Sequence, residues 1–150
     1  GGGDGGFAAD EIKRLSSYET IACGTAVDTS AADSFALFTQ SYGGQGTSIA
    51  YNVSVDDLRA RLSEGAVLVI PVDGAALQNP YFRTPPAHHT IVLRGYDAGT
   101  DSFIANDPGT SRGDGFRYTS AVIAAALRDY PTGAYQPETQ TRTAAIIVRR

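Results

Sequence analysis

Two apolar segments joined by a short connection constrain the fold of this chain more than any other feature. The segments HTIVLRGY (89–96) and SFIAND (102–107) flank DAGTD, which contains Gly99. Runs rich in β-branched and aromatic residues favour strands, and a short glycine-containing connection favours a hairpin. A third run, AVLVIPV at 66–72, is β-branched and follows Gly65, as a buried strand would. The sequence therefore predicts an antiparallel sheet.

Helical spacing and helix-ending residues mark the rest of the chain. Ser54 is a good N-cap for a helix that Gly65 would end, with two aspartates at the positive end of its dipole. We expect helices at 8–18, 31–42, 55–64 and 120–130, and strands at 66–72, 89–96, 102–106 and 143–148. This order of elements predicts an α+β fold in which helices pack on an antiparallel sheet.

Length and composition favour one domain. The chain has 150 residues, of which 42% are hydrophobic and 19% charged, enough to bury a core. The opening GGGDGG predicts a flexible, glycine-rich lead at 1–7, which leaves residues 8–150 as the domain. No methionine is present, so we expect the sequence to be a fragment or a processed product. Its single cysteine, Cys23, excludes an internal disulfide and leaves the cellular compartment open.

Charge and hydropathy exclude several partners. The formal net charge is −4 and no basic block occurs, so a nucleic-acid partner is not expected. The most apolar run is far too short to cross a bilayer, so no membrane segment is expected in this chain. No cofactor is expected either, and the oligomeric state stays open.

The two adjacent histidines and an aspartate form the candidate chemical site. Because strand side chains alternate between faces, His89 and not His88 shares a face with Ile91. A hairpin centred near Gly99 places Asp107 opposite Ile91 and therefore diagonal to His89. Diagonal neighbours lie about 7–8 Å apart, within reach of an imidazole and a carboxylate. A histidine with a carboxylate to orient it is two thirds of a nucleophilic triad.

Purely structural roles would also account for His89 and Asp107. A histidine at a strand start can be half-buried and satisfy a backbone group, and Asn-Asp-Pro-Gly is an ordinary turn in which the aspartate caps the backbone. A metal site is less favoured, because histidines on opposite faces of a strand converge poorly and no further ligand cluster is present.

Taken together, several segments resemble a known family. LRARLSEGAVLVIPVDG, HTIVLRGYD, FIANDPGT and GFRYTSAVIAAALRDYP are similar to the bacterial papain-like cysteine peptidases of the bacteriocin-processing, double-glycine leader type, and above all to their stand-alone peptidase-like branch. The resemblance extends from about residue 8 to the end. It implies a papain-like fold in which an N-terminal helix carries the nucleophile. It also implies that His89 is the general base and Asp107 its orienter.

The expected nucleophile does not follow the family pattern. In the family, a cysteine preceded by glutamine begins the first helix. Here Cys23 is the only thiol, no glutamine precedes it, and it lies about six or seven residues before the predicted helix cap. An activated thiolate favours a helix N-terminus. The helix at 8–18 resembles the family's second helix, which would place the nucleophile helix upstream of residue 1.

Three functions follow as hypotheses. In the first, the chain is the His/Asp-bearing part of a cysteine peptidase that hydrolyses peptide bonds, inactive here for want of the nucleophile. In the second, it is a non-catalytic peptidase-like module that binds an extended peptide. In the third, Cys23 is the nucleophile of a shortened but complete domain. The expected partner in each case is a peptide or protein.

Overall fold

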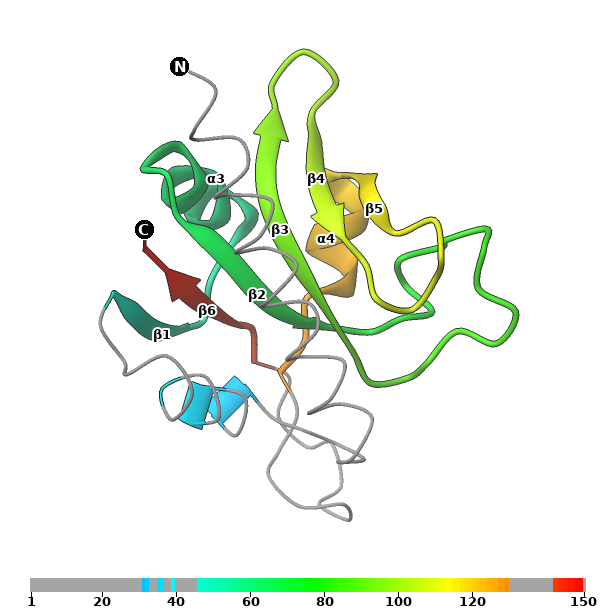
Figure 1. Cartoon of the computed structure of the whole chain (residues 1–150), viewed down its shortest axis with the longest axis horizontal. Coiled ribbons are helices and arrows are strands. Elements are labelled where there is room, and N and C mark those ends of the chain that lie inside the picture. Colours follow the sequence, from blue (N-terminus) through cyan, green and yellow to red (C-terminus); the bar gives the residue numbers. More distant parts are fainter. Residues whose placement is uncertain (1–30, 33–34, 37–38, 40–45, 130–141, 150) are drawn as a thin grey trace.

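The computed structural model describes residues 31–32, 35–36, 39, 46–129 and 142–149. Within these residues, six strands form one antiparallel sheet on which helices pack, as Figure 1 shows, so the predicted α+β class is confirmed. The named elements are β1 (Thr47–Tyr51), α3 (Val55–Ser63), β2 (Val67–Val72), β3 (His89–Asp97), β4 (Ser102–Asn106), β5 (Asp114–Thr119), α4 (Ser120–Ala126) and β6 (Ala144–Val148).

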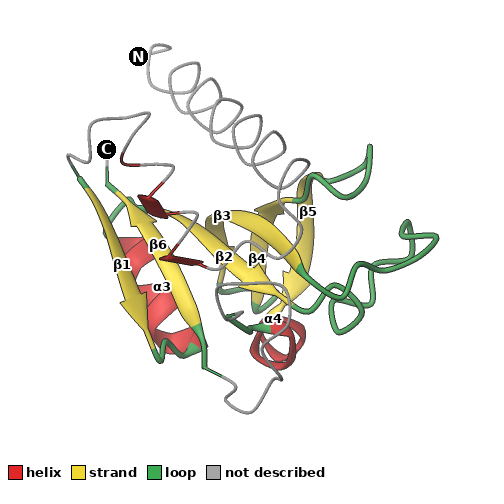
Figure 2. Cartoon of the chain, turned by 90° about the horizontal axis from the view of Figure 1, so that it is seen from below, coloured by secondary structure: helices red, strands yellow, loops and turns green. Residues whose placement is uncertain are grey.

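The strands are ordered β1-β6-β2-β3-β4-β5 across the sheet. Strands β2 to β5 are neighbours in the sheet in the order in which they occur along the chain. Strand β6, the last in the chain, lies between β1 and β2 and pairs with both. Figure 2 shows β1 and β6 side by side with α3 behind them. The central position of β2 explains its composition, because a strand with neighbours on both edges and layers on both faces has no solvent-exposed side.

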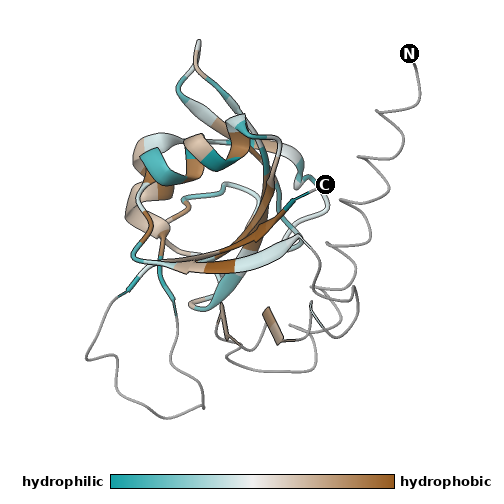
Figure 3. Ribbon diagram, turned by 90° about the vertical axis from the view of Figure 1, so that its left-hand side faces the viewer, coloured by the Kyte–Doolittle hydropathy of each residue, from teal (hydrophilic) through white to brown (hydrophobic). Residues whose placement is uncertain are grey.

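Strand β2 is the centre of the hydrophobic core. Leu68, Ile70 and Val72 pack with α3 and α4 on one face, and Val67 and Val69 pack on the other. All six residues of β2 are buried, as its apolar sequence predicts. In Figure 3 the brown, apolar stretches accordingly follow the central strands. Burial of each such aliphatic side chain stabilises the fold by about 1.5–3 kcal/mol.

Helix α3 begins and ends close to the predicted residues. The Ser54 side chain accepts a hydrogen bond from the Asp57 N–H, and the Asp57 carboxylate accepts one from the Ser54 N–H at 2.8 Å. This reciprocal capping satisfies backbone donors that would otherwise lack partners. The helix ends at Ser63, with Glu64 as its C-cap, and Gly65 follows at φ +89°, a conformation that favours glycine.

Helix α4 is shorter than predicted. The sequence favours a helix over 120–130, but the structure ends it at Ala126. Leu127 forms an isolated antiparallel bridge with Val72, and the N–H groups of Asp73 and Arg128 donate to the carbonyls of Ala126 and Pro71. Backbone pairing with the end of β2 thus replaces the last helical turn, a tertiary effect that helix propensity does not report.

The hairpin of β3 and β4 forms with the predicted connection. Asp97 pairs with Ser102, and Val92 with Asn106, across a turn that contains Gly99. One irregularity lies between Leu93 and Gly95. The predicted strands at 66–72, 89–96, 102–106 and 143–148 are therefore present within one residue at each end.

The sequence does not predict two of the strands, β1 and β5. Strand β1 follows a pair of glycines and has no strict apolar alternation, and β5 contains Gly115 and charged residues. Both are edge strands that pair on one side only. Edge strands tolerate polar and glycine residues because one side faces solvent, so hydropathy marks them weakly.

The N-terminal predictions are tested only in part. The predicted lead at 1–7, the helix at 8–18 and Cys23 lie outside the described residues. Of the predicted helix at 31–42, residues 31, 32, 35, 36 and 39 are described and helical. Phe35 packs on the face of the sheet opposite α3 and α4. No helix in the described part of the chain is both long and apolar enough to span a membrane.

Candidate active site

The structure brings His89 and Asp107 together at one end of the sheet. His89 is the first residue of β3, and Asp107 follows Asn106, the last residue of β4. Asn106 pairs with Val92, so the next residue, Asp107, lies across from Ile91. The His89 Nε2 atom lies 2.6 Å from Asp107 Oδ1. The predicted pairing of His89 with Asp107 is confirmed as geometry. The predicted register holds at this end of the hairpin, beyond the irregularity between Leu93 and Gly95, whereas the pairs nearer the turn are offset by one residue.

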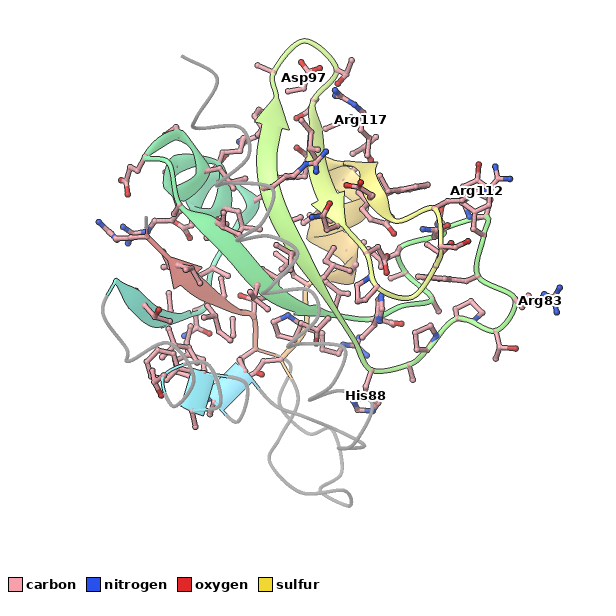
Figure 4. All side chains as sticks on the ribbon, in the orientation of Figure 1. Arg83, His88, Asp97, Arg112 and Arg117 are labelled. Carbon is pink, nitrogen blue, oxygen red and sulfur yellow. The ribbon has the colours of Figure 1, made fainter. Side chains whose placement is uncertain are left out.

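The adjacent His88 lies outside this pair. It precedes β3 and is exposed, whereas the His89 side chain is only 10% exposed and that of Asp107 is fully buried. Figure 4 shows His88 at the foot of the connection that leads into β3. The alternation of side chains along the strand therefore selects His89 as the partner of the aspartate.

The environment of Asp107 determines which nitrogen of His89 carries the proton. Burial raises the pKa of the Asp107 carboxyl, but hydrogen bonds and attraction from His89, with further donors, hold that pKa below its ordinary value of 3.8. At neutral pH Asp107 is therefore ionised and can only accept hydrogen bonds. The shared proton lies on Nε2, which leaves the lone pair of the neutral ring on Nδ1. None of the described residues forms a hydrogen bond with Nδ1.

Two further side chains complete a buried polar network. The Tyr118 hydroxyl, from β5, donates to Asp107 Oδ2 at 2.6 Å and accepts from Asn79 Nδ2 at 2.8 Å. Burial, together with the hydrogen bond to Asp107, raises the pKa of Tyr118, so its hydroxyl remains a donor. Sequence reasoning missed both residues. Tyr118 lies on the edge strand that was not predicted, and Asn79 lies in the connection after β2, where no periodicity marks it.

The turn after Asp107 packs directly against the imidazole. The Gly109 N–H donates to Asp107 Oδ1 at 2.8 Å, so the aspartate also caps its own turn. A Cβ on Gly109 would lie 2.8 Å from Phe82 Cε1 and 2.9 Å from His89 Cε1. The Phe82 ring stands edge-on to the His89 ring, with centroids 5.5 Å apart. The structural and the catalytic interpretations of Asn-Asp-Pro-Gly are therefore compatible, because one carboxylate fills both roles.

This arrangement has the geometry of an oriented general base. A buried carboxylate fixes the ring and its tautomer, and would stabilise the imidazolium that forms when Nδ1 takes a proton. Among the described residues, no group of three or more histidine, cysteine, aspartate or glutamate side chains could hold a metal ion. Cys23, the only thiol of the chain, lies outside the described residues.

Comparison with known proteins gives a family and a fold. No curated protein matches. A solved structure described as a C39-like peptidase from Bacillus anthracis is similar, with a TM-score of 0.51 and 16% sequence identity over 81% of this chain. The match covers 60% of that protein's chain, and at this identity it shows the fold alone. The sequence profile described as Peptidase_C39 like family matches residues 5–137. The chain therefore belongs to the Peptidase_C39 like family.

Proposed function

We propose that this chain is a cysteine peptidase-like domain that acts on peptide bonds, with His89 as general base and Asp107 as the residue that orients it. The observation that carries this proposal is the 2.6 Å contact from His89 Nε2 to a buried, ionised carboxylate. That contact makes Nδ1 the basic nitrogen. Membership of the Peptidase_C39 like family supports a thiol as the group that Nδ1 would serve.

The chemistry would proceed in two halves. Nδ1 of His89 takes the proton of a thiol, and the thiolate attacks the carbonyl carbon of the scissile peptide bond. The C–N bond then breaks, and the departing amine takes the proton from Nδ1. Water attacks the resulting thioester while Nδ1 accepts its proton, and that proton returns to the sulfur as the C–S bond breaks. Asp107 stays ionised throughout and stabilises the imidazolium.

We further propose that Cys23 is not this thiol and that the chain by itself does not turn over peptides. Cys23 precedes the predicted helix cap by about six or seven residues, whereas activated thiolates favour a helix N-terminus.

Alkylation of the single cysteine tests this assignment. We would measure the rate of iodoacetamide reaction against pH in the native chain, in His89→Ala and in His88→Ala. A thiol without an imidazole partner should have a pKa of about 8.5. The dependence of its alkylation rate on pH should then be the same in all three proteins. A thiolate that forms well below that pH and is lost only in His89→Ala would identify Cys23 as the nucleophile. Hydrolysis of a peptide panel that disappears in Cys23→Ser would establish the same.

The second candidate is a peptidase-like module that binds peptides without cleaving them. It is favoured by the sequence position of Cys23, which precedes the predicted helix cap by about six or seven residues instead of lying at the helix N-terminus that an activated thiolate favours. Both candidates leave a bound peptide intact in this chain, and they differ in the coding sequence upstream of residue 1. A glutamine and a cysteine-bearing helix encoded there would support the first candidate, whereas an unrelated domain or a start codon would support the binding module.

A further inference from the structure

Two arginines beside the site differ from all the others that the structure describes. Arg83 lies in the connection between β2 and β3, and Arg112 lies in the connection between β4 and β5. Both are exposed, and neither has a carboxylate partner among the described residues. Every other described arginine lies within 3.9 Å of a carboxylate oxygen: Arg59, Arg61, Arg94, Arg117, Arg128, Arg142 and Arg149.

Arg112 is held in place by an aromatic ring. Its Cζ atom lies 5.0 Å from the centroid of the Tyr81 ring, which is 46% exposed. The Tyr81 ring stands edge-on to Phe116 at 6.1 Å, and the Tyr81 N–H donates to Asn79 Oδ1 at 2.9 Å. We call Tyr81 and Arg112 the Tyr81–Arg112 platform.

The platform is connected to the candidate active site through the buried network. Asn79 donates to the Tyr118 hydroxyl, and that hydroxyl donates to Asp107, the partner of His89. Phe116 also packs against Tyr118, with ring centroids 4.8 Å apart. The platform is therefore linked to the imidazole through a continuous set of side-chain contacts.

A guanidinium held by a cation–π contact and without a carboxylate partner suits a carboxylate ligand. Its N–H donors form a planar fork that matches the two oxygens of a carboxylate. The chain carries a net charge of −4 and uses its acidic side chains to neutralise the other described arginines. Figure 4 shows Arg83 and Arg112 reaching outward from neighbouring connections on one side of the molecule, away from the Asp97–Arg117 pair.

We propose that the Tyr81–Arg112 platform binds an acidic side chain of the peptide substrate, with Arg83 adding attraction at longer range. This inference rests on the proposed function, because it assigns a substrate class to the same site. Arg112 is the residue that determines specificity, and Tyr81 is the residue that positions it.

Paired peptides test the proposal without requiring catalysis. The probe is a set of short acetylated and amidated peptides, labelled with a fluorophore, in which glutamate or glutamine occupies each position in turn. Binding is followed by fluorescence anisotropy at low salt. At one position the glutamate peptide should bind about tenfold more tightly, the lower range for a hydrogen bond to a charged group. This preference should decrease as salt is added.

Charge-matched variants separate specific contact from general attraction. Arg112→Gln should abolish the preference for glutamate without weakening the glutamine peptide. Arg149→Gln, which removes the same charge at the end of β6, should retain the preference. Arg112→Glu should invert the preference, so that a lysine peptide binds more tightly than its glutamine counterpart. Tyr81→Phe should bind as the native chain does, and Tyr81→Ala should lose most of the preference.

The possible failures point to different errors. Equal binding of glutamate and glutamine peptides, with perturbation of the His89 ring resonances, would overturn the acidic substrate class and leave peptide binding intact. Equal loss of the preference in Arg112→Gln and Arg149→Gln would show non-specific attraction and overturn the role of Arg112. Failure of every peptide to bind would overturn both this inference and the proposed function.

Discussion

Asp107 and Asp101 each accept a hydrogen bond from a tyrosine hydroxyl, Tyr118 for one and Tyr96 for the other, but they lie in different environments. The Asp107 side chain is fully buried beside His89, whereas that of Asp101 is 64% exposed at the tip of the β3–β4 hairpin. Similar donors therefore surround a carboxylate inside the protein and a carboxylate at its surface.

The difference shows that burial increases the free-energy cost of losing a hydrogen-bond partner. Water can replace a lost donor at the exposed Asp101, which also contacts Ser120 and Arg59. At Asp107 no water replaces a lost donor, so each missing partner leaves a charge or a polar group unsatisfied. The hairpin-tip network joins elements together, whereas the Asp107 network fixes the orientation and the tautomer of His89.

Removal of each carboxylate should give the largest contrast. Asp107→Ala leaves the His89 ring and the Tyr118 hydroxyl without their acceptor, and we expect it to lower the free energy of unfolding by about 3–5 kcal/mol. Asp101→Ala should have a much smaller effect, because water can replace the exposed carboxylate as a partner of the side chains that it contacts. Urea denaturation of both variants measures the difference. Equal losses would show that burial does not distinguish the two sites.

The two tyrosines should differ in the same direction. Tyr118→Phe leaves Asp107 Oδ2 and the Asn79 amide without a partner, and we expect a loss of about 2 kcal/mol. Tyr96→Phe, at the exposed network, is the matched control and should change stability less. Because the pKa of Tyr118 is raised, the native chain should also lose stability as pH increases above about 10, the pKa of an unfolded tyrosine. That alkaline loss should be reduced in Tyr118→Phe and retained in Tyr96→Phe.

Glycine substitutions test the space around the imidazole. Gly109→Ala would place a Cβ against Phe82 and His89, and we expect a loss of about 1 kcal/mol with a clear shift of the His89 ring resonances. Gly99→Ala is the control at the hairpin tip, where the Cβ would meet only Asp97 Oδ1 at 3.2 Å, the end of a flexible side chain. NMR spectra in which Gly109→Ala leaves the His89 ring unchanged would contradict the packing described for this turn.

The acid pH dependence should be a gradual effect. Because the folded pKa of Asp107 is lowered, its contribution to stability is present above its unfolded value and is lost as pH falls through the folded value. The stability difference between the native chain and Asp107→Asn should therefore decrease below about pH 4, by at most about 1.4 kcal/mol per pH unit. A difference that stays constant down to pH 2 would contradict a lowered pKa. NMR of the same pair should show that the substitution perturbs the His89 ring and not the His88 ring.

Much of the fold could be predicted because its signals are local. The capping of α3 by Ser54 and its end at Gly65 depend on neighbouring residues, as does the hairpin turn at Gly99. The strand β2 is apolar throughout because it is buried on both faces. The edge strands β1 and β5 escaped prediction because solvent on one side relaxes the apolar pattern.

The residues of the site likewise separate into those that local sequence patterns predict and those that only tertiary contacts bring together. Strand alternation and a hairpin register predicted the pairing of His89 with Asp107. The structure reaches this register through an irregularity between Leu93 and Gly95 that the sequence does not mark. Tyr118 and Asn79 could not be predicted, because they reach Asp107 only when β5 and the connection after β2 come together in the folded sheet. Their residue types occur at many positions, and only their surroundings distinguish them.

The sequence by itself determined the α+β class, the central strands, the start of α3 and the histidine-aspartate pair, because each depends on residues within one element or one hairpin. Tertiary structure decided the end of α4 at Ala126, the position of β6 between β1 and β2, and the closed polar network around Asp107. These features depend on contacts between residues distant along the chain. Their free energy comes from burial and from hydrogen bonds that form only after the sheet has assembled.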